Sequence, residues 1–189
     1  MKVLVLNGSP KRYGNTAGLI DLILAAAQEA SGGGIEVEYV LLNELTYKGC
    51  QACLSCKQGD ATMCRQRDEL APVISRMADA DAWILGTPIY MGQISGQLKM
   101  CLDRTFGFNG PDRTSRLPAG KKAVIAVTQG NPNPLGFQHV TTWLCSSLGR
   151  LGMETESVVG TRSTSVPDRL FAPEAEERAR SIGAWLVSK

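Results

Sequence analysis

Residues 3–16 read VLVLNGSPKRYGNT, and this stretch decides the fold. Its first four residues are all apolar, as in strands that are buried on both faces of a parallel sheet. A loop that contains two glycines follows the strand, and apolar residues at helical spacing then predict a helix over residues 15–30. A strand, a glycine loop and a helix in this order predict the first unit of an alternating α/β domain.

The same alternation continues along the rest of the chain. Apolar or β-branched runs predict further strands at residues 35–41, 82–85, 123–128 and 154–159. Helical patterns predict helices at residues 68–79, 93–105, 137–151 and 173–189. Because right-handed crossovers place helices on both faces of a parallel sheet, we expect one doubly wound, five-stranded α/β domain over residues 1–189. The flavodoxin-like strand order 2-1-3-4-5 fits best, and its ligand crevice lies at the carboxyl ends of strands 1 and 3.

The composition of the chain disfavours membrane and nucleic-acid functions. No apolar run approaches the roughly 18 residues of a membrane-spanning helix. The apolar run after Lys2 has only four residues, which is too short for a signal peptide, so we expect a cytoplasmic protein. The net charge is +2 and no basic run exceeds two residues, so no electrostatic surface for nucleic acid is expected.

The first loop, residues 7–16, is suited to binding an anion. The N–H groups and the dipole at the start of a helix attract negative charge, and hydroxyl and amide side chains add donors. The spacing of Gly8 and Gly14 matches neither the triphosphate loop GxxxxGK[ST] nor the dinucleotide motif GxGxxG. The loop therefore predicts a site for a cofactor that carries one phosphate, and a tight turn without a ligand is the alternative.

A second segment, GTPIYMGQISGQLKMCLDR at residues 86–104, follows the third predicted strand. Together with GSP and GNT in the first loop, it resembles the flavodoxin-like NADPH-dependent FMN reductase family over most of residues 1–130. The resemblance implies an FMN phosphate site formed by Ser9, Lys11, Arg12, Asn15 and Thr16. It also implies a flavin-ring loop formed by Pro88, Ile89, Tyr90, Met91 and Gly92.

The residue types in the second segment agree with that role. Proline and glycine bracket a turn whose backbone N–H groups can reach the polar edge of a flavin, and Ile89, Tyr90 and Met91 supply apolar cover. Donors at this edge favour a reduced, anionic flavin. As in related folds, we expect Thr128 and Gly130, in the sequence TQGN, to close the third side of the crevice. An ordinary turn is the alternative for that loop.

Four of the six cysteines are concentrated in GCQACLSCKQGDATMC, residues 49–64. Disulfides are rare in a reducing compartment, so this cluster predicts a metal site or redox chemistry. The spacing of Cys50, Cys53 and Cys56, followed by Cys64, is more compact than the paired knuckles of structural zinc sites and is typical of a [4Fe-4S] cluster. Zinc, a redox-active thiol pair and unliganded cysteines remain alternatives. Cys101, Cys145 and His139 are expected to pack within helices.

The cysteine motif also resembles that of the iron-sulfur flavoproteins, a branch of the same family. Because strand 2 is expected beside strand 1, we expect the cluster and the flavin to share one edge of the sheet. Two loops stand out from the domain: a cysteine-rich loop at residues 48–67, and a polar excursion at residues 107–120 for which we expect the role of a lid or a subunit contact.

The resemblance implies a flavin-dependent oxidoreductase in which FMN carries the chemistry and no catalytic side chain is required. It implies ferredoxin or NAD(P)H as the electron donor, quinones or small oxidants as acceptors, and a homodimer or homotetramer. An NAD(P)H:FMN or quinone reductase without a cluster is one alternative. A zinc- or thiol-based sensing module is another.

Overall fold

The computed structural model describes residues 1–58, 64–161 and 171–188. Within these residues the strands form a sheet in the order β2-β1-β3-β5-β6, and a short antiparallel β4 pairs with β3 alone. The strands are β1 (Lys2–Asn7), β2 (Glu36–Leu41), β3 (Ala82–Tyr90), β4 (Gln93–Ile94), β5 (Lys122–Thr128) and β6 (Glu154–Gly160). The five long strands are parallel, so the predicted flavodoxin-like order 2-1-3-4-5 is confirmed.

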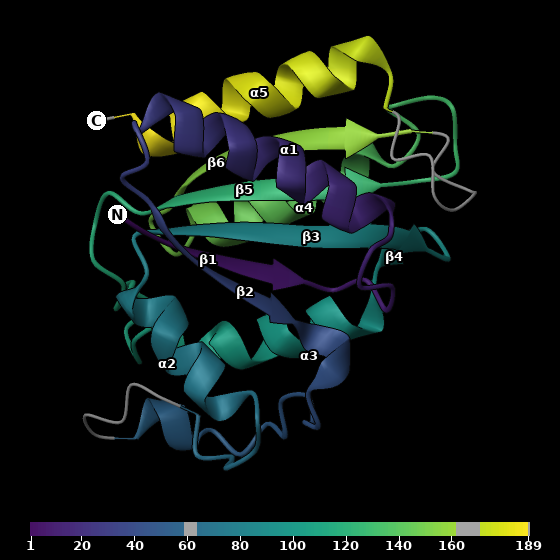
Figure 1. The fold of residues 1–189 in the computed structure, drawn as a ribbon. Helices are drawn as coiled ribbons and strands as arrows, with labels where there is room; N and C mark the ends of the chain where they lie inside the picture. Colours follow the sequence, from purple (N-terminus) through teal and green to yellow (C-terminus); the bar gives the residue numbers. More distant parts are fainter. Residues whose placement is uncertain (59–63, 162–170, 189) are drawn as a thin grey trace.

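Helices cover both faces of the sheet (Figure 1). One face packs against α1 and α5, and the other packs against α2, α3 and α4. The helices are α1 (Asn15–Ala30), α2 (Ala71–Asp79), α3 (Gly96–Arg104), α4 (Gln138–Gly149) and α5 (Pro173–Val187), with short 3-10 turns η1 (Leu42–Glu44), η2 (Ser55–Lys57) and η3 (Thr105–Phe108). In the part of the chain that the structure describes, no helix combines the length and apolar character needed to cross a membrane.

The alternation of side chains along β1 explains why its sequence is apolar throughout. Val3 and Val5 are buried in the core under α1 and α5, while Leu4 and Leu6 are buried in the opposite core. Successive side chains of a strand point to opposite faces, so a strand covered on both sides has no polar position. The apolar run that predicted a parallel sheet therefore reflects two separate cores.

The end of β3 differs from the prediction. The strand was predicted at residues 82–85, but it continues to Tyr90, and the chain then turns at Met91 and Gly92 into β4. Both turn residues have positive φ, 49° and 77°, which is the geometry of a two-residue type I′ hairpin. Residues 93–94 therefore pair as a strand, and α3 starts only at Gly96, where Ser95 caps it by accepting the N–H of Leu98.

Candidate functional site

The loops that follow β1, β3 and β5 lie together at the carboxyl edge of the sheet, on the right in Figure 1. The Gly8 N–H donates to the Gly86 carbonyl at 2.8 Å, and the hydroxyl groups of Thr16 and Thr128 hydrogen-bond at 2.8 Å. The strands β1 and β3 lie side by side here although β2 separates them in the chain, so this edge contains the switch point at which doubly wound sheets bind ligands.

Two glycines allow the loops to approach each other so closely. A Cβ atom at Gly8 would lie 2.6 Å from Ser95 Oγ, and one at Gly86 would lie 2.4 Å from Ile20 Cδ1. Real Cβ atoms essentially never lie at such distances, so a larger residue at Gly8 would push the first loop away from the start of α3, and one at Gly86 would push β3 away from α1. The two glycines thus allow the first loop to lie directly against β3.

The start of α1 has the properties of an anion site. Its N-cap is Gly14, which makes no side-chain hydrogen bond to the helix, and the first turn contains no acidic residue. The first N–H groups of a helix have no partner within the helix, and its dipole favours an anion at this end. Ser9 is buried just before the helix, where its hydroxyl accepts the Lys11 N–H at 3.2 Å. A phosphate matches these donors.

Asn7 shapes this loop and was not predicted as a site residue. It is fully buried at the end of β1, its Oδ1 accepts the Ser9 N–H at 2.9 Å, and its Nδ2 donates to the Tyr39 hydroxyl at 2.7 Å. A polar residue at the end of an otherwise apolar strand is the signal that could have identified it. Asn7 therefore links the anion loop to β2.

The two cations of the first loop are placed differently from the buried hydroxyls. The Lys11 side chain is exposed, whereas Arg12 forms an ion pair with Glu44 in η1, with Nε 3.0 Å from Oε1. Bonding to Glu44 raises the pKa of the Arg12 guanidinium above its ordinary value. Arg12 is therefore paired with a carboxylate of this chain. Among the predicted phosphate contacts, Ser9 and Thr16 are the ones that lie buried at the loop.

The hairpin between β3 and β4 carries the predicted flavin-ring residues. Pro88 and Ile89 are half-buried, while Tyr90 and Met91 project from the sheet edge as exposed apolar side chains. The Gly92 carbonyl lies 3.2 Å from His139 Nε2, so His139, which was expected to be structural, contacts the hairpin. The predicted ring loop is thus an exposed apolar hairpin beside the anion loop.

The loop after β5 forms the third side of the site. Thr128 is buried through its contact with Thr16, and Gly130 is exposed. The buried Gln129 side chain donates to the carbonyls of Asn131 at 3.2 Å and Asn133 at 2.6 Å. Gln129 therefore fixes the shape of this loop, a role that was not predicted.

A separate cavity of about 150 Å³ is lined by all four cysteines of the predicted metal motif. Cys50 and Cys53 are exposed, and Cys56 and Cys64 are half-buried. Among residues 1–58, 64–161 and 171–188, no three His, Cys, Asp or Glu side chains are close enough to enclose a metal ion. The structure thus places the four cysteine residues around one cavity without bringing their side chains together as a ligand shell.

Several donors face the sulfur atoms of this cavity. The Ala52 N–H donates to Cys50 Sγ at 3.4 Å, and Gln66 Nε2 donates to Cys64 Sγ at 3.7 Å. Hydrogen bonds from Ser55 lower the pKa of the Cys53 thiol. Donors of this kind stabilise thiolates, which are the form that binds metals. By contrast, burial raises the pKa of Cys101 to about 12, in agreement with its predicted packing role.

Arg104, at the end of α3, lines the same cavity and was not predicted as a site residue. Its side chain is fully buried, and its Nη1 donates to both Asp68 carboxylate oxygens, at 2.7 and 2.6 Å. Nε and Nη2 are buried and have no hydrogen-bond partner among the described residues. Burial raises the pKa of Asp68, but Arg104 and the backbone N–H groups of Lys48 and Ala71 more than offset this and hold it below its ordinary value. A buried cation with unused donors therefore borders the four cysteines.

The cysteine loop does not lie beside the anion loop, so the expected shared edge is wrong within one chain. After η1 the chain follows α3, where the Tyr47 hydroxyl donates to the Gln97 carbonyl at 2.7 Å and the Lys48 carbonyl accepts from Arg104 Nη1 at 3.3 Å. The cysteines therefore reach the far end of α3 (Figure 1). The 9 residues of α3 span about 13 Å at 1.5 Å per residue.

The polar excursion at residues 107–120 packs against the cysteine loop. Arg116 Nη1 donates to the Cys56 carbonyl at 2.9 Å and to the Gly107 carbonyl at 3.2 Å. From the other side, Lys57 Nζ donates to the Phe106 carbonyl at 2.7 Å and lies 3.8 Å from the centre of the Phe106 ring. The excursion thus holds the cysteine loop.

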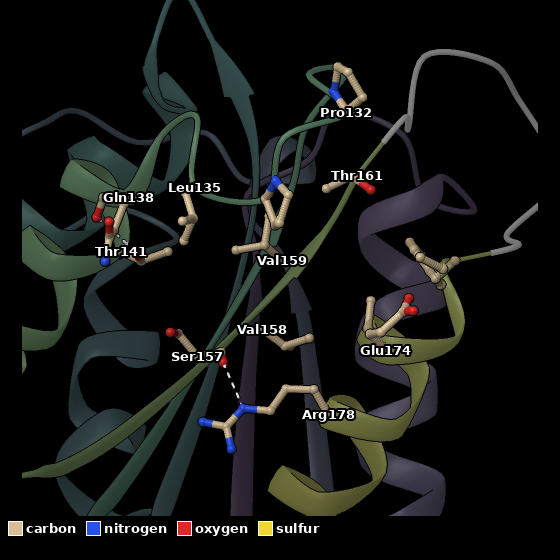
Figure 2. A pocket seen from close by; sticks show the side chains of 14 residues that line it. Pro132, Leu135, Gln138, Thr141, Ser157, Val158, Val159, Thr161, Glu174 and Arg178 are labelled. Atoms are coloured by element: carbon tan, nitrogen blue, oxygen red, sulfur yellow. Dashed lines mark hydrogen bonds between the residues drawn. The ribbon is translucent and has the colours of Figure 1, made fainter.

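A larger cavity of about 850 Å³ lies on the other side of the β5–α4 loop, between β6 and α5 (Figure 2). Pro132 and Leu135 line it from the loop, and none of the predicted site residues borders it. Arg178 Nε donates to the Ser157 carbonyl at 3.4 Å and so covers part of the free edge of β6.

Comparison with known proteins agrees with this arrangement. The family model for NADPH-dependent FMN reductase matches residues 1–157. An iron-sulfur flavoprotein of Archaeoglobus fulgidus is 38% identical over 105 residues, which cover 56% of this chain and only 49%, about half, of that relative. An iron-sulfur flavoprotein of Methanosarcina thermophila is 31% identical over 144 residues, which cover 76% of this chain and 73% of that protein.

A solved structure shows the same fold at low sequence identity. The NAD(P)H:quinone oxidoreductase from Methanothermobacter marburgensis superposes with a TM-score of 0.72 at 17% identity, over 100% of this chain and 98% of that one. The likeness supports the strand order and the position of the loops at the carboxyl edge of the sheet. On the evidence of the family model and the curated relatives, the chain belongs to the NADPH-dependent FMN reductase family, in the branch of the iron-sulfur flavoproteins.

Proposed function

We propose that the protein is an FMN-dependent oxidoreductase that binds FMN at the carboxyl edge of β1, β3 and β5. The observation that carries this proposal is the N-terminus of α1, which has no side-chain cap and begins beside the buried Ser9 hydroxyl. This end of α1 suits the single phosphate of FMN better than a pyrophosphate, because the loop has neither glycine motif of nucleotide sites.

Each side of the site has a distinct part in holding the cofactor. We assign the phosphate to the first turn of α1 and to the side chains of Ser9, Lys11, Asn15 and Thr16. We assign the flavin ring to the hairpin from Pro88 to Gly92, where Tyr90 and Met91 would exclude water, and to the loop at Thr128 and Gly130. Bound FMN supplies hydride and electron transfer, so the side chains need only bind, orient and shield it.

The substrates are proposed from the relatives. The quinone oxidoreductase with the same fold is named for NAD(P)H and quinones. We propose NAD(P)H or ferredoxin as the electron donor and quinones or other small oxidants as acceptors. The open, apolar hairpin at Tyr90 and Met91 supports planar substrates of this kind.

We further propose that Cys50, Cys53, Cys56 and Cys64 hold a [4Fe-4S] cluster. The fit rests on three features of the cavity: four cysteines line it, N–H groups donate to the sulfur atoms of Cys50 and Cys64, and Arg104 borders it with unused donors. Such a cluster with four thiolates is anionic, and a buried cation compensates that charge. A cluster passes one electron at a time, so it would connect FMN with one-electron carriers.

A quinone reductase without a cluster is the second candidate function. It is favoured by the absence, among the described residues, of three ligand side chains close enough to enclose a metal ion. It shares every proposed FMN contact, so metal analysis alone separates the two candidates.

Anaerobic purification followed by assays of iron, sulfide, zinc and FMN tests both proposals. We expect about one FMN and about four irons per chain, with the broad visible absorbance of a cluster beneath the flavin bands. FMN at full occupancy without iron would select the second candidate. Stoichiometric zinc without flavin would instead contradict the oxidoreductase and support a sensing module.

The FMN site is tested by Ser9→Ala, with Ser31→Ala as a control at the opposite end of α1. Removing the Ser9 hydroxyl should raise the FMN Kd roughly tenfold, the equivalent of about 1.4 kcal/mol, because a hydrogen bond to a charged phosphate is lost. The Ser31 hydroxyl donates to the Gln28 carbonyl, far from the proposed phosphate site, so its variant should bind FMN with unchanged affinity. Equal Kd values for the two variants would place the phosphate elsewhere.

A further inference from the structure

We propose that Arg104 sets the charge of the four-cysteine cavity and raises the reduction potential of the iron-sulfur group bound there by donating hydrogen bonds to it from Nε and Nη2. This inference rests on the proposed cluster. Arg104 acts as a positioning residue, because it places the positive charge and the N–H donors of its guanidinium group beside the four cysteines proposed to bind the metal.

The hydrogen bonds of Arg104 are divided unequally over its guanidinium group. Nη1 makes every bond that the structure records, to both oxygens of Asp68 and to the Lys48 carbonyl. Nε and Nη2 are as deeply buried and have no partner among the described residues. Arginine stays protonated in proteins, so these N–H groups cannot be removed by titration. Buried donors without acceptors are unfavourable, which indicates that an acceptor is missing from the described atoms.

The cavity provides the place for that acceptor. Arg104 lines it together with the four cysteines. Asp68 lies on the Nη1 side, so the remaining donors are available to a sulfur-rich anion. A surface cation, Arg65, also lines the cavity, but its side chain is exposed and donates to the Ser55 hydroxyl at 3.4 Å, at the limit of a hydrogen bond.

The sign of the effect follows from the charge change. Reduction adds one electron from the donor to the cluster and no proton, so the cluster becomes more negative. A nearby buried cation and hydrogen bonds to the sulfur atoms stabilise the reduced form, whereas a nearby carboxylate destabilises it. Arg104 should therefore raise the potential and Asp68 should lower it. Solvent screens the charge of the exposed Arg65.

The test compares Arg104→Gln, Asp68→Asn and the control Arg65→Gln in anaerobically purified protein. Midpoint potentials are measured by redox titration followed by electron paramagnetic resonance, together with iron and sulfide content. We expect Arg104→Gln to lower the reduced-to-oxidised ratio at a fixed potential at least tenfold, which is about 59 mV for one electron. Asp68→Asn should shift the potential in the opposite direction, and Arg65→Gln should leave it unchanged.

The opposite shifts separate this role from a structural one. If Arg104 only supported the fold, both variants would lose iron and the remaining cluster would keep the wild-type potential, which would overturn the inference. If Arg104→Gln retains no iron, the Asp68→Asn variant decides the question. A midpoint potential above that of the wild type supports the inference, and an unchanged or lower midpoint potential overturns it. Wild-type protein without iron would overturn the proposed cluster as well, whereas wild-type iron with unshifted potentials in the variants would overturn only the role of Arg104.

Discussion

Met91 occupies a backbone conformation that side chains with a Cβ atom rarely adopt. Its φ is 49°, and its side chain is fully exposed at the tip of the β3–β4 hairpin. Positive φ at such a residue costs on the order of 1 kcal/mol or more, and Asn followed by Gly is the usual sequence for this turn. Because the Met91 side chain is fully exposed, its burial within the described chain does not offset this cost. A role outside the chain's own packing, such as the proposed contact with the flavin, would explain why the residue is there.

We therefore expect Met91→Asn to raise the free energy of unfolding by about 1 kcal/mol while weakening FMN binding. Chemical denaturation and fluorescence titration with FMN measure the two effects. Leu54→Asn is the matched control, because Leu54 is also exposed with a positive φ of 55° but lies in the cysteine loop. It should gain similar stability without a change in FMN affinity, and a parallel change in both variants would contradict the role of Met91.

The two glycines Gly86 and Gly96 should respond in opposite ways to the same substitution. A Cβ at Gly86 would lie 2.4 Å from Ile20 Cδ1 and 3.0 Å from Thr16 Cγ2, whereas Gly96 has nothing within 4 Å. Gly86→Ala should lower the free energy of unfolding by about 1–3 kcal/mol through overpacking. Gly96→Ala should raise it by about 0.5 kcal/mol, because alanine loses less backbone entropy in a helix. Thermal denaturation of both variants checks the difference in sign.

Short-range patterns identified some site residues and could not identify others. Ser9 and Thr16 follow a strand and precede a helix, so their place at the anion loop could be read from the sequence. The contact of Arg104 with Asp68 joins residues 36 positions apart, and no local pattern signals such a pair. The only available signal was a cation at the end of an otherwise helical run, in the motif KMCLDR.

At the scale of elements, the central strands were predictable because β1, β3 and β5 begin with continuous apolar runs, and helices such as α1 were predictable because they bury apolar residues at helical spacing. The β3–β4 hairpin was not, since its turn depends on positive φ at Met91 and its second strand has only 2 residues. The path of residues 45–49 was missed for a different reason. It depends on contacts with α3, such as the bond from Tyr47 to Gln97, which only the tertiary structure creates.

Lys57 joins the cysteine loop to η3 and should control the local stability of both. Its ammonium bonds to the carbonyls of Phe106 and Asn109 and lies over the Phe106 ring. Lys57→Met keeps the alkyl chain and removes these bonds, so amide hydrogen exchange in residues 105–110 should accelerate roughly tenfold, the equivalent of about 1.4 kcal/mol. Lys48→Met is the control, because the Lys48 side chain is exposed in the same loop. Equal exchange in the two variants would show that Lys57 does not hold η3.

At the scale of the whole molecule, α3 separates the two proposed sites. Ser95, at its start, contacts the first loop, and Arg104, at its end, borders the cysteines. Both sites thus use one helix, but within one chain they share no loop. The flavodoxin-like sheet alone provides the proposed FMN edge, whereas the described part of the cysteine loop lies outside α2 and α3 (Figure 1), where Lys57 and Arg116 join it to residues 105–116.

This separation predicts that the two proposed cofactors can be removed independently. FMN at 100 times its Kd should add about 2.7 kcal/mol to the free energy of unfolding, and for a chain of this length the Tm should rise by about 5–10 °C. Removal of iron with a chelator under anaerobic conditions should leave that FMN-dependent rise in Tm unchanged, because the anion loop makes no use of residues 48–67 in the described structure. Ser9→Ala should reduce the rise at the same FMN concentration. Loss of FMN in step with iron would instead show that the cysteine loop contributes to the flavin site, through this chain or a neighbouring copy.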